Sequence, residues 1–257
     1  MTQPPCVPNL RAAAQGGRAA LGLLTILPVG SAPVGPAALR AAPAWFPLVG
    51  GLVGALAAGI WALVEPALGS AYATALALTV SAIASGGLHH DGLADTADGL
   101  GARGDAARRL AAMRDPGIGA FGALSLIAWA LLSLTALSRL DPADAVAALV
   151  CGHVLGRWSA LPQLALLAPA RADGLGASFS AGPVAITAGS ACTCAIALAV
   201  SGIGAGGAAL AGATVASAVV ALVAKRSISG RTGDTLGASV LITELVVYSL
   251  LAAYWTS

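Results

Sequence analysis

The chain has 257 residues, of which 58% are hydrophobic and only 9% are charged, and its formal net charge is +2. A soluble domain usually carries about a quarter charged residues, so this composition excludes a water-soluble globule. The small net charge says nothing about nucleic acid, but the sequence has no basic run of the kind that follows a phosphodiester backbone, so we expect no nucleic-acid partner. We therefore expect one membrane-embedded, all-α domain over residues 1–257, because a spanning segment in lipid must satisfy its own backbone hydrogen bonds.

The first apolar segment runs from Ala19 to Val29, behind Arg11 and Arg18. At about eleven residues it is too short to cross a bilayer as a helix, and it contains Pro28. We expect a short interfacial or re-entrant helix here.

Longer apolar segments follow, and each is suited to a membrane-spanning helix. They run roughly over residues 45–64, 71–89, 118–137, 143–164, 184–203, 206–224 and 236–255. Small residues four positions apart, such as Gly50 with Gly54 and Gly202 with Gly206, favour close helix packing. The sequence thus predicts a polytopic bundle of about seven transmembrane helices surrounded by lipid.

Basic residues gather in alternate loops. The loops near residues 90–117, 165–183 and 225–235 carry most of the arginine and lysine, and in a seven-span topology they share one side with the N-terminal arginines. Loops rich in Lys and Arg face the cytoplasm. We expect the polar loops, and any chemistry they perform, to face the cytosol.

The polar stretch at residues 86–101 reads GGLHHDGLADTADGLG. Asp91, Asp95 and Asp98 fall at i, i+4 and i+7, which on a helix places them within about 60° of one another. Placing a charged carboxylate in the bilayer costs about 2.5–3.5 kcal/mol of free energy at its centre and less near its surface. Mg²⁺ or Mn²⁺ prefers such oxygen ligands. We interpret the three as ligands of a divalent metal; the plain alternative is a solvated loop with this spacing by chance.

Two residues near the acids are candidates for contact with substrate. His89 could ligate the metal, donate a hydrogen bond to phosphate or move a proton, or else lie at the interface without a function. Arg114 is suited to bidentate phosphate contact, but as a positive-inside anchor it has an equally good explanation.

The last polar loop, residues 225–238, reads KRSISGRTGDTLGA. Its glycines and hydroxyls lie next to the start of the last span, where backbone N–H groups can cradle an anion. Asp234 is interpreted as a metal ligand or ribose contact, with the N-cap of the last helix as the alternative. The candidate substrate-binding residues here are Lys225, Arg231, Thr232, Gly233, Asp234 and Thr235.

Glu244 lies within the last span. An ionisable residue at such a position is a functional candidate. Arg157, near the end of the fourth span, is its expected partner, or else contacts phosphate or anchors its own span.

These segments together resemble the cobalamin synthase family, adenosylcobinamide-GDP ribazoletransferase. The resemblance covers most of the chain and rests chiefly on the acidic stretch and on TGDTLGASVLITEL from Thr232, supported by shorter matches. The shorter matches are LLTILPVG, WFPLVGGLVG, MRDPGIGAFG, LGRWSALP and GLGASF. The sequence departs from the family pattern at His90, at Pro116 with Gly117, and at Arg231.

The resemblance implies transfer of adenosylcobinamide phosphate from adenosylcobinamide-GDP to α-ribazole or its 5′-phosphate, with release of GMP. It also implies a Mg²⁺ requirement and an inner-membrane location. As a mechanistic hypothesis, the metal on the three aspartates holds the diphosphate, the ribazole 3′-hydroxyl attacks phosphorus, and Asp98 accepts its proton. Arg114, Lys225 or Arg231 offsets the remaining phosphate charge.

Two other functions stay open at this point. A CDP-alcohol phosphotransferase has a related acidic pattern, but its Asp-Gly-x-x-Ala-Arg core is missing, because Asp95 follows Ala94 here. An ion-coupled transporter would place carboxylates near the membrane midplane, whereas these acids lie beside a loop.

Overall fold

A computed structural model describes residues 10–30 and 33–257. The described residues form helices joined by short turns, with no β-strand among them, which confirms the all-α prediction. The helices at the polar end of the bundle are short. They are α1 (Leu10–Leu24), α2 (Pro36–Ala41), the 3₁₀ helix η1 (Ala42–Trp45), α4 (Leu88–Gly101), α5 (Ala106–Ala112), α8 (Ala160–Leu166) and α9 (Leu175–Ser178).

The long helices are α3 (Phe46–Ala84), α6 (Ala120–Leu137), α7 (Pro142–Trp158), α10 (Pro183–Ile228) and α11 (Gly233–Trp255). Within the described residues, five helical segments are long and apolar enough to cross a membrane. Large apolar side chains such as Leu63, Ile127 and Ile203 are more than half exposed on their outer faces. Long apolar helices with apolar exteriors are typical of a membrane protein.

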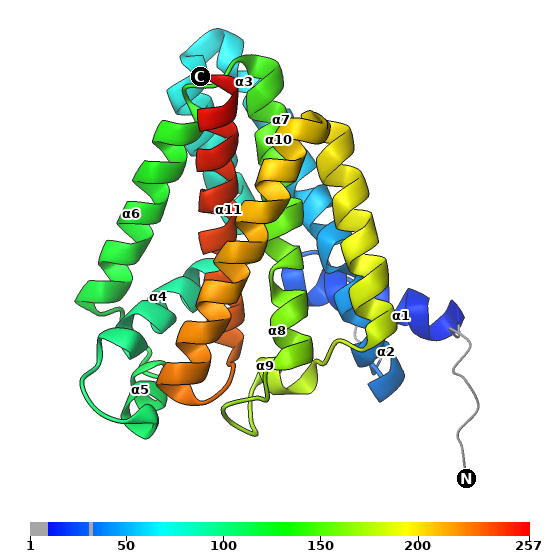
Figure 1. Cartoon of the computed structure of the whole chain (residues 1–257), viewed down its shortest axis with the longest axis vertical. Helices are drawn as coiled ribbons and strands as arrows, with labels where there is room; N and C mark the ends of the chain where they lie inside the picture. Colours follow the sequence, from blue (N-terminus) through cyan, green and yellow to red (C-terminus); the bar gives the residue numbers. More distant parts are fainter. Residues whose placement is uncertain (1–9, 31–32) are drawn as a thin grey trace.

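Two of the long helices contain a break. Gly69 in α3 has φ 77° and Gly202 in α10 has φ 76°, a left-handed conformation that favours glycine. Figure 1 shows the two arms of α10, yellow and orange, meeting at the end of the bundle opposite α5. The predicted segments 45–64 and 71–89 thus fall mainly in the two arms of α3, and 184–203 and 206–224 fall in the two arms of α10. The five long helices therefore do not by themselves confirm the predicted number of seven spans.

The N-terminal helix also differs from its predicted range. It runs over Leu10–Leu24 rather than 19–29. Its last turn is closed by the Thr25 hydroxyl, which donates to the carbonyl of Leu21 at 2.7 Å. The arginine-containing stretch that precedes the apolar run is therefore part of the helix.

Glycines set how closely the core helices approach. A Cβ on Gly50 would lie 2.9 Å from the carbonyl carbon of His153, and one on Gly54 would lie 2.9 Å from Val150 Cα, so α3 packs directly on the α7 backbone. This confirms the close contact predicted for that pair. In the second predicted pair, Gly206 packs on the Ala197 carbonyl, whereas Gly202 is the break itself.

The polar elements lie together at one end of the bundle. Figure 1 shows α4, α5, α8 and α9 at the end opposite the point where the two arms of α10 meet, beside the start of α11 and the last turn of α10. The three basic loops thus share one side of the bundle, as the charge pattern predicts.

Candidate active site

The acidic stretch forms the short helix α4, which lies across the polar end of the bundle. Gly86 (φ 61°) and Gly87 (φ 70°) turn the chain away from α3 immediately before it begins. Because α4 is helical, Asp91, Asp95 and Asp98 lie along one side of it, as the spacing predicts.

A glycine contact places the first turn of α11 against α4. A Cβ on Gly92 would lie 2.8 Å from the Asp234 carbonyl oxygen and 3.1 Å from Gly237 Cα. The helices can approach this closely only because both positions lack a side chain. The contact sets Asp234 beside the acids of α4, although more than 130 positions separate them in the chain.

The negative charge of this group is only partly balanced. Burial, followed by the charges of Asp91, Asp234 and Asp98, raises the pKa of Asp95 to about 6, while Arg171 acts in the opposite direction. Within the described residues no three His, Cys, Asp or Glu side chains converge as a complete metal site. The group is therefore a set of neighbouring carboxylates rather than a closed protein cage.

Asp98 has a different partner from the one expected. Its two carboxylate oxygens accept hydrogen bonds from the backbone N–H groups of Gly119 (2.8 Å) and Gly122 (2.9 Å). These groups belong to the first turn of α6, where N–H groups lack helical acceptors and attract an anion. In the structure the Asp98 carboxylate fastens α4 to the start of α6, and its predicted role as metal ligand and base stays a prediction.

Arg171 is the functional candidate that the sequence did not single out. Its guanidinium donates to Asp234 at 3.0 Å, and both side chains are less than one-fifth exposed. Its Nη1 atom is buried and has no partner. With Asp91, Thr232 and Gly233 it lines a polar cavity of about 210 Å³. The only sequence signal was a lone arginine in a glycine-containing loop on the basic side.

The start of α11 is capped by Thr232, not by Asp234. The Thr232 hydroxyl accepts from the Thr235 backbone N–H (3.2 Å), and the Thr235 hydroxyl accepts from the Thr232 N–H (2.9 Å). This capping box satisfies two groups of the first turn. The alternative of an Asp234 N-cap is therefore wrong, and the Asp234 carboxylate points to the cavity instead.

Arg231 is used by the fold. Its guanidinium donates to the backbone carbonyls of Leu167 (3.0 Å), Phe179 (2.9 Å) and Gly176, and the residue is 3% exposed. These bonds attach the loop before α10 to the start of α11. Arg231 therefore shapes the wall of the polar cavity, and its predicted contact with phosphate stays a prediction.

The other two predicted cations lie at the edge of the site. Arg114 forms an exposed ion pair with Asp173 at 2.5 Å, which links the loop after α5 to the loop before α9. Lys225 is exposed near the end of α10. Neither lines the polar cavity.

Glu244 and Arg157 form the expected buried ion pair between α11 and α7. Arg157 also donates to the Ser85 hydroxyl at 3.0 Å, at the end of α3. Gly156 makes room for the pair, because a Cβ there would lie 2.8 Å from Glu244 Cγ. The ion pair together with the Ser85 bond joins α7, α11 and the end of α3.

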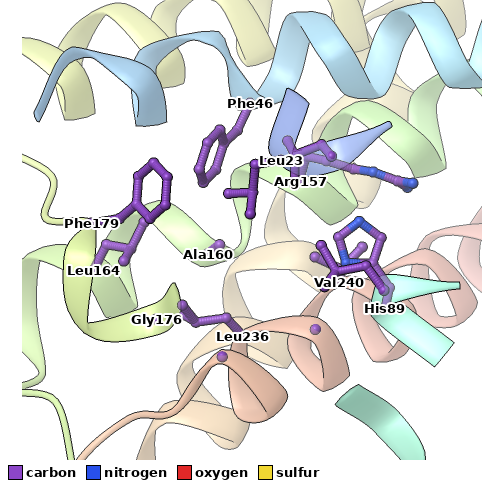
Figure 2. Close-up of a pocket in the computed structure, with 14 residues that line it drawn as sticks. Leu23, Phe46, His89, Arg157, Ala160, Leu164, Gly176, Phe179, Leu236 and Val240 are labelled. Carbon is purple, nitrogen blue, oxygen red and sulfur yellow. The ribbon is translucent and has the colours of Figure 1, made fainter. Parts of the chain in front are cut away.

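His89 points away from the carboxylates. It is 3% exposed, and neither ring nitrogen has a hydrogen-bond partner. Figure 2 shows it beside a second, apolar cavity, together with Leu23, Phe46 and Phe179. The structure therefore separates His89 from the three acids with which the sequence grouped it.

Comparison with known proteins gives a consistent result. The family model described as cobalamin-5-phosphate synthase matches residues 16–252. Proteins named adenosylcobinamide-GDP ribazoletransferase are similar along most of their length. That of Bradyrhizobium diazoefficiens is 37% identical over 92% of this chain and 93% of its own, and that of Ralstonia nicotianae is 38% identical over 96% and 98%. That of Mesorhizobium japonicum is 39% identical over 78% of each chain. No solved structure matches. The chain therefore belongs to the cobalamin-5-phosphate synthase family.

Proposed function

We propose that this chain is an adenosylcobinamide-GDP ribazoletransferase, as its relatives are named. It transfers adenosylcobinamide phosphate from adenosylcobinamide-GDP to α-ribazole or its 5′-phosphate and releases GMP, in the final stage of cobalamin synthesis. The observation that carries the proposal is the glycine-mediated contact of α4 with α11, which brings Asp91, Asp234 and Arg171 to one polar cavity. Asp95 lies on α4 within the electrostatic reach of all three.

The two interrupted helices give the proposed topology. If each arm of α3 and α10 crosses the membrane, the chain makes seven passes, and α1 lies at the interface beside the polar elements. The basic loops then place this end of the bundle in the cytoplasm, where nucleotides are found. We place the protein in the inner membrane with its site facing the cytoplasm.

The carboxylates suit a Mg²⁺ ion, with Mn²⁺ as an alternative. Mg²⁺ in proteins is commonly held by one or two carboxylates together with water and substrate phosphates, so a closed cage of three is not required. Asp91 and Asp95, one turn apart on α4, are the proposed ligands, with Asp234 nearby. A bound ion would supply neutralisation of charge on the diphosphate and the departing GMP.

Other residues of the site position the substrates and stabilise their charge. Phosphoryl transfer depends mainly on alignment and charge stabilisation. Arg171 is held by Asp234 and keeps one buried N–H group without a partner, so it is placed to receive a phosphate oxygen. Because Asp98 is bound to α6, the proton of the attacking hydroxyl goes to a carboxylate of the Asp91, Asp95 and Asp234 group.

The test is GMP release by the purified chain in lipid nanodiscs, from adenosylcobinamide-GDP and α-ribazole. We expect turnover that stops with excess chelator and returns with Mg²⁺, and loss of turnover in Asp95→Asn. Arg171→Gln should raise KM for the GDP-linked substrate about tenfold, the effect of one charged hydrogen bond. Glu65→Gln, a carboxylate change near the Gly69 break, is the control. Full activity of Asp95→Asn, or undiminished activity in chelator, would contradict the proposal.

A further inference from the structure

The polar end of the bundle contains a second cavity that the diphosphate chemistry does not use. It lies between α1, α3, α4, α8 and α11 and has almost entirely apolar walls. Figure 2 shows Leu23, Phe46, Leu164 and Phe179 around it. The rings of Phe46 and Phe179 have centroids 6.2 Å apart and are tilted by 57°, so they pack on each other and form an aromatic part of the cavity wall.

One polar side chain in its lining lacks a partner. His89 is 3% exposed, and both of its ring nitrogens are buried without a hydrogen bond. Buried polar groups in folded proteins nearly always have a partner. The other polar side chain in the lining, Arg157, is bonded to Glu244 and Ser85 through its two terminal nitrogens, and only its Nε atom is without a partner. The cavity therefore offers one free imidazole, with one donor and one acceptor when neutral.

This cavity adjoins the polar cavity of the proposed active site. Leu88, Gly176 and Gly233 line both. On α4, His89 faces the apolar cavity, while Asp91, two residues later, faces the polar one. A molecule with a flat apolar end and a polar end could occupy both cavities at once.

We propose that the apolar cavity binds the aromatic base of the acceptor nucleoside, with His89 donating a hydrogen bond to the free ring nitrogen of that base. The inference rests on the proposed function. A benzimidazole base is flat, and its one free ring nitrogen matches the one free imidazole. Guanine has several donors and acceptors that these walls would leave unpaired.

With the base in this cavity, the ribose extends past Leu88 and Gly233 toward Asp91 and Arg171. The attacking hydroxyl then reaches the phosphate from the side of α4. His89 is thus a specificity residue for the acceptor, in place of the catalytic role that the sequence suggested.

The test compares wild type, His89→Leu and the control His90→Ala in nanodiscs. His90 is the adjacent residue, but its ring packs edge-on against Trp129, 4.9 Å away. KM is measured separately for α-ribazole and for adenosylcobinamide-GDP, and for an indole nucleoside in which carbon replaces the acceptor nitrogen. His89→Leu should raise KM for α-ribazole about tenfold, the effect of one hydrogen bond, and leave KM for the GDP-linked substrate unchanged.

Wild type should discriminate against the indole nucleoside by a similar factor, and His89→Leu should lose this discrimination. A change in KM for the GDP-linked substrate instead would assign the cavity to guanine and overturn the inference. No change in either KM, or discrimination that persists in His89→Leu, would overturn it as well. All of these outcomes require that the wild-type protein releases GMP. If the proposed function is wrong, the wild type releases no GMP, and this result is distinct from every KM outcome above.

Discussion

A methyl group added at Gly92 tests whether the contact of α4 with α11 aligns the active site. The new Cβ would lie 2.8 Å from the Asp234 carbonyl oxygen and 3.1 Å from Gly237 Cα. Both neighbours are backbone atoms and cannot rotate away. The helices must separate by about 0.6 Å, the difference between 2.8 Å and the 3.4 Å at which ordinary contact begins. Because misplacement by 1 Å can cost about 100-fold in rate, we expect Gly92→Ala to lower kcat about 10- to 100-fold.

The assay is GMP release at saturating concentrations of both substrates, with thermal unfolding measured on the same samples. Two further glycine-to-alanine variants serve as comparisons, because their new Cβ atoms meet a weaker contact or none. Gly237→Ala meets its nearest atom at 3.3 Å and should lose less activity, whereas Gly59→Ala meets nothing within 4 Å. Gly59→Ala should remain fully active and at least as stable, because alanine favours a helix over glycine by about 1 kcal/mol. Wild-type turnover in Gly92→Ala, or equal losses in all three variants, would refute the alignment argument.

Three further predictions concern charged groups. Asp98→Asn should retain more activity than Asp95→Asn. It should lower the free energy of unfolding by about 0.5–2 kcal/mol, because the Asp98 carboxylate caps α6. Thermal unfolding measures the stability and GMP release measures the activity; an equal loss of turnover in the two variants would return Asp98 to the catalytic group. The pKa of Asp95 is raised from 3.8 to about 6, so the folded metal-free protein holds this proton where the unfolded chain has lost it. The contribution of Asp95 to stability should therefore fall as pH rises through about 6, and Mg²⁺ should offset the loss; a melting temperature that does not respond to Mg²⁺ at neutral pH would contradict this. Glu244→Ala leaves Arg157 buried without its carboxylate and should cost about 3–5 kcal/mol, visible as a lower denaturation midpoint; an unchanged midpoint would show that the pair is not required.

Local patterns in the sequence predicted several features of the fold and site. Apolar length predicted the membrane helices, the spacing of Asp91, Asp95 and Asp98 predicted one acidic helix side, and Glu244 inside a span predicted its pairing with Arg157. Each depends on residues within one element or on the high cost of an unpaired charge in an apolar region. Such information is present in the chain before it folds.

The composition of the active site was decided only by tertiary contacts. The approach of Gly92 to Gly237 brings Asp234 to α4, and the first turn of α6 supplies two backbone N–H groups that bind the Asp98 carboxylate. The pairing of Arg171 with Asp234 likewise joins residues far apart in the sequence. A carboxylate has the same chemistry whether a metal, a helix end or an arginine lies beside it. The role of a carboxylate therefore depends on which backbone N–H groups and which charged side chains lie next to it. Packing between helices that are distant in the sequence determines those neighbours.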